Sequence, residues 1–136
     1  MRPSNLDIVR SIYLDWERGD FASVEWADPE IEFVIVDGPA PGGWTGLEGM
    51  AKGWRGFLDA WEEFRSLAED YRELDENRVA AFVQLSGRGR GSELELGQMR
   101  TTSLALFELA GGKVVRLALY WDRERALDEL GLSAEG

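Results

Sequence analysis

The sequence predicts a single α+β domain in which helices dominate the first half and strands the second. Up to about residue 64, most apolar side chains recur at helical spacing, and from residue 66 onward the pattern changes to long strand-like runs joined by short turns. A chain of 136 residues has the usual size of one domain, and its patterned part runs from about residue 5 to 131. Segregation of helices from strands along the chain is typical of the α+β class.

The chain opens with signals for an amphipathic helix. Ser4 and Asp7 have the spacing of a capping box, and Gly19 can end the helix. The apolar positions between them follow helical spacing: Ile8, Val9, Ile12 and Trp16. Asp20 can then cap a short second helix that reaches about residue 26.

A strand and a loop follow these helices. Residues 31–37 are rich in β-branched and aromatic side chains, so they predict a strand, and its alternation places Phe33, Ile35 and Asp37 on one face. Residues 38–46 are rich in Gly and Pro, which predicts a long loop with Trp44 exposed in it.

The next segment has the clearest helical pattern in the chain. Its apolar positions form one stripe: Leu47, Met50, Trp54, Phe57, Leu58, Trp61 and Phe64. Gly53 and Gly56 each cost such a helix about 1 kcal/mol relative to Ala, so we expect a close approach by backbone or ligand there.

Four strands and one helix complete the expected order of elements, α-α-β-α-β-β-β-β-α. The strands are predicted at about 66–74, 77–88, 93–109 and 113–121. The last helix is predicted at Arg123–Leu130, with Asp122 as its N-cap and Gly131 as its C-cap.

Composition excludes several classes of function. The formal net charge is −11, so nucleic acid and an anionic membrane surface are unfavourable partners. The chain has no histidine and no cysteine, which excludes Ser-His-Asp and Cys-His catalysis, zinc sites built on these residues, and disulfides. No set of carboxylates has metal-loop spacing, so we expect no metal, and we expect no other cofactor.

The N-terminus lacks the apolar segment of a signal peptide, and no apolar run is long enough for a membrane span. We therefore expect a cytoplasmic protein.

Six short motifs carry a resemblance to a known family. They are Trp-Glu-Arg-Gly-Asp-Phe (16–21), Asp-Pro-Glu-Ile-Glu-Phe (28–33), Trp-Thr-Gly-Leu-Glu-Gly (44–49), Gly-Arg-Gly-Arg-Gly-Ser (87–92), Gly-Gly-Lys-Val-Val-Arg (111–116) and Tyr-Trp-Asp-Arg-Glu-Arg-Ala-Leu (120–127). With these motifs the chain resembles the SnoaL-like branch of the nuclear transport factor 2-like superfamily over about residues 5–131. The resemblance implies a cone, in which a long helix covers a curved, mostly antiparallel sheet that is open at one end. It leaves the reaction open, because this cone hosts isomerases, cyclases, hydrolases, dehydratases and binding proteins.

Asp37 is the candidate catalytic residue. It falls at the position of the general-base carboxylate in the ketosteroid isomerases, which the chain resembles distantly, and a carboxylate can serve as a base. The alternative is turn chemistry, in which the Asp of an Asp-Gly-Pro sequence bonds the backbone ahead of it. The partners of an isomerase base are not matched, because the helix position falls on Ile12, one residue from Tyr13, and the late-strand position falls on Ser103 or Ala105.

Ligand contact is expected mainly from tryptophans near the open end of the cone. Trp44 in the predicted loop and Trp121 at the end of the last strand are the leading candidates, because flat aromatic rings give a large contact area at low entropic cost. Arg100, on a strand, can pair with an anionic ligand or a buried acid. The expected ligand-binding residues are Phe33, Ile35, Trp44, Trp54, Phe57, Arg100, Ser103 and Trp121.

Two functions follow from these expectations. In the first, the protein binds a small, largely apolar organic molecule, and Asp37 is the base for proton transfer, isomerisation or cyclisation without a cofactor. An epoxide hydrolase on the same cone is disfavoured, because one of its carboxylates would fall near Leu119. In the second, the cone binds a ligand or dimerises without catalysis.

A homodimer is expected from the outer face of the sheet. Its apolar residues are Leu104, Leu106, Ala118 and Tyr120. Because the long helix can cover one face only, a second subunit is the expected cover for the other.

Overall fold

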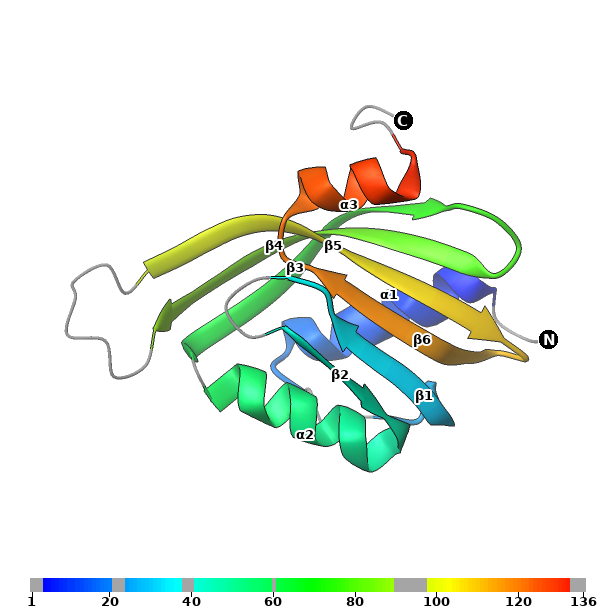
Figure 1. The fold of residues 1–136 in the computed structure, drawn as a ribbon, viewed down its shortest axis with the longest axis horizontal. Coiled ribbons are helices and arrows are strands. Elements are labelled where there is room, and N and C mark those ends of the chain that lie inside the picture. The colour runs from blue at the N-terminus through cyan, green and yellow to red at the C-terminus, as the bar shows by residue number, and fades with distance from the viewer. Residues whose placement is uncertain (1–3, 21–23, 38–40, 60, 90–97, 133–136) are drawn as a thin grey trace.

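The elements form one curved, unclosed sheet with helices on both of its faces (Figure 1). The computed structural model describes residues 4–20, 24–37, 41–59, 61–89 and 98–132. The elements are α1 Asn5–Glu17, β1 Ala27–Ile35, β2 Gly42–Thr45, α2 Gly46–Asp59, β3 Trp61–Glu73, β4 Arg78–Gly89, β5 Gln98–Ala110, β6 Lys113–Tyr120 and α3 Arg123–Leu130. The α+β cone predicted from the sequence is confirmed.

The sheet has the order β2-β1-β6-β5-β4-β3. Strands β3 to β6 form an antiparallel meander, with Val83 of β4 opposite Ser103 of β5. Strand β1 joins this meander parallel to β6, with Phe33 opposite Leu117, and pairs antiparallel with β2, with Phe33 opposite Trp44. Two strands that are far apart in sequence, β1 and β6, are thus neighbours in the sheet.

Helices α1 and α3 begin at the predicted N-caps Ser4 and Asp122, and α1 ends with Arg18 as its C-cap, one residue before the predicted Gly19. The Asp7 N–H donates to Ser4 Oγ at 3.1 Å, and the Glu124 N–H donates to Asp122 Oδ1 at 3.0 Å. Helix α3 ends at Gly131, whose φ of 69° is a left-handed conformation that favours glycine.

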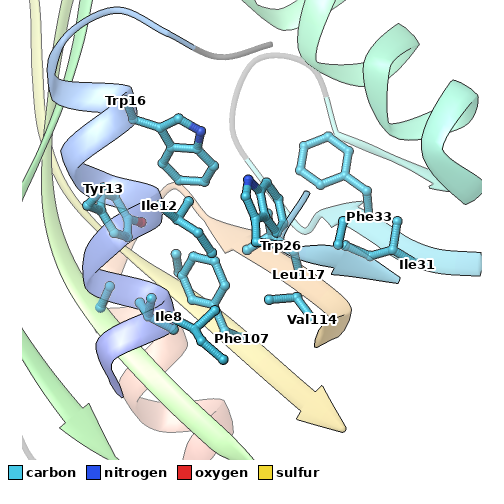
Figure 2. Close-up of a cluster of buried hydrophobic side chains, with 14 of the residues drawn as sticks. Ile8, Ile12, Tyr13, Trp16, Trp26, Ile31, Phe33, Phe107, Val114 and Leu117 are labelled. Atoms are coloured by element: carbon cyan, nitrogen blue, oxygen red, sulfur yellow. The ribbon is translucent and has the colours of Figure 1, made fainter. Parts of the chain in front are cut away.

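Two apolar cores lie on opposite faces of the sheet. The larger one fills the concave face beneath α1 and α2, and Figure 2 shows Tyr13 and Trp16 of α1 in this cluster with Phe33 of β1 and Phe107 of β5. The smaller one lies on the outer face beneath α3. Because the inner core occupies most of the cone, the remaining space is a pocket rather than a wide channel.

The outer core removes the argument that predicted a homodimer. Leu104, Leu106, Ala118 and Tyr120 are buried there, packed with Ala126 and Leu127 of α3. The last helix covers these residues, so they need no second subunit, and that reason for dimerisation was wrong. Dimerisation itself stays a prediction.

The short second helix predicted from Asp20 to about residue 26 differs from the structure where the structure describes it. Residues 24–26 lie in a turn, in which the Ala27 N–H donates to the Val24 carbonyl at 3.0 Å. Residues 21–23 lie outside the described part of the chain. Strand β1 begins at Ala27, so Asp28 and Pro29 lie within a strand rather than at the end of a helix.

The long helix is shorter than its apolar stripe predicts. Helix α2 ends at Asp59, and Trp61 and Phe64 belong to strand β3. The spacing of these two residues fits a helix equally well, but the backbone at Trp61 pairs with Gly89 of β4. Pairing with a distant strand therefore overrides the local period.

The predicted loop at residues 38–46 contains a strand. Residues 42–45 form β2, which pairs with β1, while residues 38–40 lie outside the described part of the chain. Trp44 is partly buried rather than exposed, because its ring packs on Phe33 with 5.6 Å between the ring centroids. Across the described ranges, no helix combines the length and the apolar character that a membrane crossing requires.

Candidate functional site

A pocket lies inside the cone, between helices α1 and α2 and the concave face of the sheet. The empty space between its lining atoms, including the open mouth, is about 430 Å³, of which about 30 Å³ can take the centre of a water molecule. Buried lining residues such as Tyr13 and Ser103 mark its inner end, whereas the partly exposed Asp37, Leu85 and Trp121 mark its open end. The pocket is thus narrow and suits a compact ligand.

Asp37 lines the open end of this pocket. It follows β1, and strand alternation continues to its position, so Asp37 lines the same pocket as Ile35. The Trp121 N–H donates to Asp37 Oδ1 at 2.7 Å, and the Asp122 N–H donates to Asp37 Oδ2 at 3.2 Å. The carboxylate therefore ties the end of β1 to the junction between β6 and α3. The backbone groups that it bonds are distant in sequence, whereas residues 38–40, to which the turn alternative refers, lie outside the described part of the chain.

Three hydroxyl groups belong to residues at the inner end. Tyr13 is 1% exposed, and Ser66 and Ser103 are each 4% exposed. Within the described part of the chain, none of these three hydroxyls makes a hydrogen bond to another protein group. Burial, together with the nearby Tyr71, raises the pKa of the Tyr13 phenol well above its usual value. Tyr13 is therefore a neutral hydrogen-bond donor at physiological pH.

Aromatic rings from two helices form the rigid wall of the pocket. Trp16 of α1 contacts Trp54 of α2 edge to face at 5.0 Å between ring centroids, and contacts Tyr13 in the same manner at 4.8 Å. Trp54 in turn stacks on Phe33 at 5.3 Å. These contacts fix the rings, because Trp16, Trp54 and Phe33 come from three different elements, α1, α2 and β1.

Arg123 holds two pocket strands from the outer side of the sheet. Its side chain donates to the Ser103 carbonyl at 3.1 Å and to the Val83 carbonyl at 3.0 Å, and it forms an ion pair with Glu69 at 2.8 Å. It also lies over the ring of Phe82 at 5.3 Å. Asp37 and Arg123 together fix the three residues Trp121, Asp122 and Arg123 to strands β1, β4 and β5.

The structure brings together about half of the residues expected to bind a ligand. Asp37, Ile35, Trp54, Ser103 and Trp121 line one pocket. Phe33 lies behind Trp54 in the core, and Trp44 packs on Phe33 instead of lining this pocket. The side chains of Phe57 and Arg100 lie outside the described part of the structure.

Nine of the described residues that line the pocket were not among the expected site residues, and two of these, Tyr13 and Ser66, carry hydroxyl groups at its inner end. Tyr13 follows Val9 by four residues and precedes Trp16 by three, so it belongs to the apolar stripe of α1 and this spacing could have identified it. Ser66 has no comparable signal, because its place in the pocket depends on the register of β3 against β4. Ser103 was expected from the resemblance, whereas Ser66, which lines the same pocket, was not.

Charge in the site is negative and localised. Among the described residues that line the pocket, Asp37 is the one that carries a charge. The neighbouring Arg125 bonds Glu129, and its pKa is raised chiefly by that bond, with Asp37 among the further causes. In the described ranges no group of three or more acidic side chains gathers in a way that could hold a metal ion.

The described residues thus form an α+β cone with an apolar pocket, a carboxylate at the mouth of the pocket and hydroxyls at its inner end. Residues 9–117 match the SnoaL-like domain family, and the chain belongs to this family. No protein of curated function matches the chain in sequence.

Solved structures of low sequence identity share the fold. Bal32a, from a soil-derived mobile gene cassette, is 19% identical with a TM-score of 0.74, and the match covers 92% of this chain and 94% of that one. A proposed polyketide cyclase from Xanthomonas campestris pv. campestris is 19% identical with a TM-score of 0.68, over 92% and 95% of the two chains. A protein with a ketosteroid isomerase-like fold from Catenulispora acidiphila, in complex with trimethylamine, is 16% identical with a TM-score of 0.67, over 98% of each chain.

Proposed function

We propose that this protein binds a small, largely apolar organic molecule that carries an oxygen atom, and that Asp37 is the base for proton transfer on it. One observation carries the proposal: a single pocket combines a carboxylate at its mouth with three almost fully buried hydroxyls in otherwise apolar walls. The names of two relatives in fold, a proposed polyketide cyclase and a ketosteroid isomerase-like protein, refer to carbonyl compounds and agree with this reaction class. The reaction is an isomerisation or cyclisation that needs no cofactor.

The chemistry follows from the arrangement of these groups. Each Asp37 oxygen accepts one backbone N–H and keeps a lone pair, which can take a proton from a carbon next to a carbonyl. The carbonyl oxygen gains negative charge as that proton leaves. Tyr13, Ser66 and Ser103 supply the donors that stabilise such a charge.

Hydrogen–deuterium exchange on an enolisable ketone tests this proposal. The probe is 2-tetralone, and NMR in D₂O measures the rate at which its α-protons exchange. We expect exchange above the buffer rate with the native protein and with Asp122→Asn, and the buffer rate with Asp37→Asn. Asp122→Asn is the matched control, because it removes the same charge from a residue that caps α3 and does not line the pocket. Exchange by the Asp37→Asn protein would exclude Asp37 as the base.

A second candidate function is ligand binding without catalysis. It is favoured by the backbone hydrogen bonds to both oxygens of Asp37, which give this residue a structural task that explains its position. On this alternative, 2-tetralone changes the tryptophan fluorescence saturably, and its α-protons exchange at the buffer rate. Trp121→Leu should weaken the binding, because Trp121 lines the mouth, whereas Trp26→Leu should not, because Trp26 packs in the core away from the pocket.

Self-association is a further part of the proposal. Leu67 of β3 is 44% exposed on the outer face, beyond the strip that α3 covers. Contact with a second copy at this place would remove the apolar side chain of Leu67 from water. Light scattering should return about twice the chain mass of 15.3 kDa, and a clean monomer would contradict this part.

A further inference from the structure

We propose that the ligand of this pocket is a small organic cation, with an alkylated ammonium group at the mouth beside Asp37 and Trp121. The inference rests on the binding part of the proposed function and narrows the ligand class. Three features of the site carry the inference. They are the charge of the lining residues, the aromatic rings of the walls and the net charge of the residues around the mouth.

The lining carries one negative charge and no positive one among its described residues. A bare carboxylate next to an apolar wall attracts a cation and repels an anion, since the low dielectric strengthens both effects. The hydrogen bonds that Asp37 accepts come from neutral backbone N–H groups and leave its formal charge uncompensated. A carboxylate ligand would place a second negative charge beside the first.

The walls are aromatic on several sides. Tyr13, Trp16, Trp54 and Trp121 line the same pocket and come from α1, α2 and the end of β6. Rings that surround a site attract ammonium groups through the negative charge of their faces, and methylated ammonium groups most of all, because they shed water easily. Trp121, the ring at the mouth with Asp37, therefore favours an alkylated ammonium there over a neutral group of the same shape.

The charged residues around the mouth also favour a cation over an anion. Arg123 is paired with Glu69 and Arg125 with Glu129, and Arg125 also interacts electrostatically with Asp37. With the adjacent Asp122, these six charged groups leave a net charge of −2 around the mouth. The whole chain carries −11, which steers cations toward the surface. The inner hydroxyls of Tyr13, Ser66 and Ser103 offer hydrogen bonds to a polar atom at the far end of the ligand.

The size of the pocket sets a limit on the ligand. The space open to the centre of a water molecule is about 30 Å³, so the narrow interior suits a compact head group. A trimethylammonium group with a short hydroxylated arm has this form. In the proposed orientation its charge lies at the mouth, and its hydroxyl points toward the inner end.

Three probes of one shape and different charge test the inference on the native protein. Choline is the cation, 3,3-dimethylbutan-1-ol is its neutral carbon analogue, and 3,3-dimethylbutanoate is the anion. Tryptophan fluorescence and saturation-transfer NMR measure their dissociation constants. We expect choline to bind at least tenfold more tightly than the neutral alcohol, the anion not to bind, and the choline affinity to fall with added NaCl.

Two matched variants assign the preference to Asp37. Asp37→Asn should bring the choline-to-alcohol ratio close to one, and Asp122→Asn should keep most of it, because Asp122 does not line the pocket. Equal or tighter binding of the neutral alcohol by the native protein would overturn the cation assignment and leave the proposed function standing. Failure of all three probes and of 2-tetralone to bind would overturn both. If Asp37→Asn does not fold, the comparison of the three probes on the native protein decides the question alone.

Discussion

The carboxylate of Asp37 accepts the backbone N–H of Trp121 at 2.7 Å, although the two residues are separated by 84 positions in the chain. The hydrogen bond closes the β1–β6 pair where the chain leaves the sheet for α3. Asp37 therefore has a structural task in addition to its place at the mouth of the pocket. Loss of activity in an Asp37 variant has to be separated from loss of folding.

Asp37→Asn should destabilise the protein by about 1–3 kcal/mol, because the amide offers one acceptor where two backbone N–H groups need one each. Urea unfolding measures the free energy of unfolding. Asp122→Asn is the control and should cost less than about 1 kcal/mol, since Asn is as good an N-cap as Asp. An Asp37→Asn protein as stable as the native one would show that the two backbone bonds contribute little.

Gly53→Ala should destabilise the protein, although Ala is the better helix former. A Cβ at position 53 would lie 2.8 Å from the ring of Trp44 and 2.9 Å from the ring of Phe33. Overpacking of this kind costs about 1–3 kcal/mol. Gly56→Ala on the same helix meets no atom within 4 Å and should stabilise by up to about 1 kcal/mol. Thermal melting of the pair should give shifts of opposite sign, and a gain in both variants would contradict the close approach of Trp44.

Arg123→Met should cost about 1–3 kcal/mol, because two strand carbonyls and Glu69 lose a charged donor. Arg125→Met, two residues away, loses one exposed ion pair with Glu129 and should leave the free energy of unfolding almost unchanged. Chemical unfolding compares the two variants. Equal costs would mean that the contacts of Arg123 on the outer face do not stabilise the sheet.

Tyr13→Phe should reduce the loss of stability at alkaline pH. Burial raises the pKa of Tyr13, so below about pH 10 both the folded and the unfolded chain hold the phenol proton. Above that pH the unfolded chain releases its proton first, and the free energy of unfolding falls as pH rises. Tyr71 and Tyr120 also have raised pKa values, so the variant should keep part of the decline. Unfolding curves at pH 8 and pH 11 test this, and an unchanged slope in the variant would show that Tyr13 ionises freely.

Features of the fold that depend on neighbouring residues could be predicted from the sequence. Helix α1 begins after Ser4 and helix α3 lies between Asp122 and Gly131, because capping needs only atoms within one turn. The antiparallel meander followed from short turns such as that at Gly111 and Gly112, both of which have positive φ.

Features set by distant contacts could not be predicted in this way. Trp61 fits the apolar stripe of a helix, and only its pairing with Gly89 makes it part of a strand. Trp44 lies among glycines that predict a loop, yet those glycines leave room for its ring, which folds back over Gly53. The apolar period at Trp61 and the Gly-rich composition around Trp44 each fit more than one structure. Tertiary packing determines which structure forms.

The same distinction between local and distant contacts applies to the candidate site. Alternation along β1 placed Asp37 on the face of Ile35, and both line the pocket. The hydrogen-bonding partners of Asp37 could not be predicted from the sequence. The N–H groups of Trp121 and Asp122 come close to its carboxylate only because β6 pairs with β1. Ser66 entered the pocket by the same kind of long-range pairing.

The position of β1 beside β6 has a consequence for synthesis of the chain. While the ribosome makes residues 1 to about 112, β1 has β2 on one side and an unpaired edge on the other. The hydroxyls of Tyr13, Ser66 and Ser103 are already present at that stage, but Asp37 has neither of its backbone donors. Only when Trp121 and Asp122 leave the exit tunnel can the mouth of the pocket close around its carboxylate. The mouth of the candidate pocket therefore forms late, after β6 has paired with β1 and just before α3 can cover the outer core.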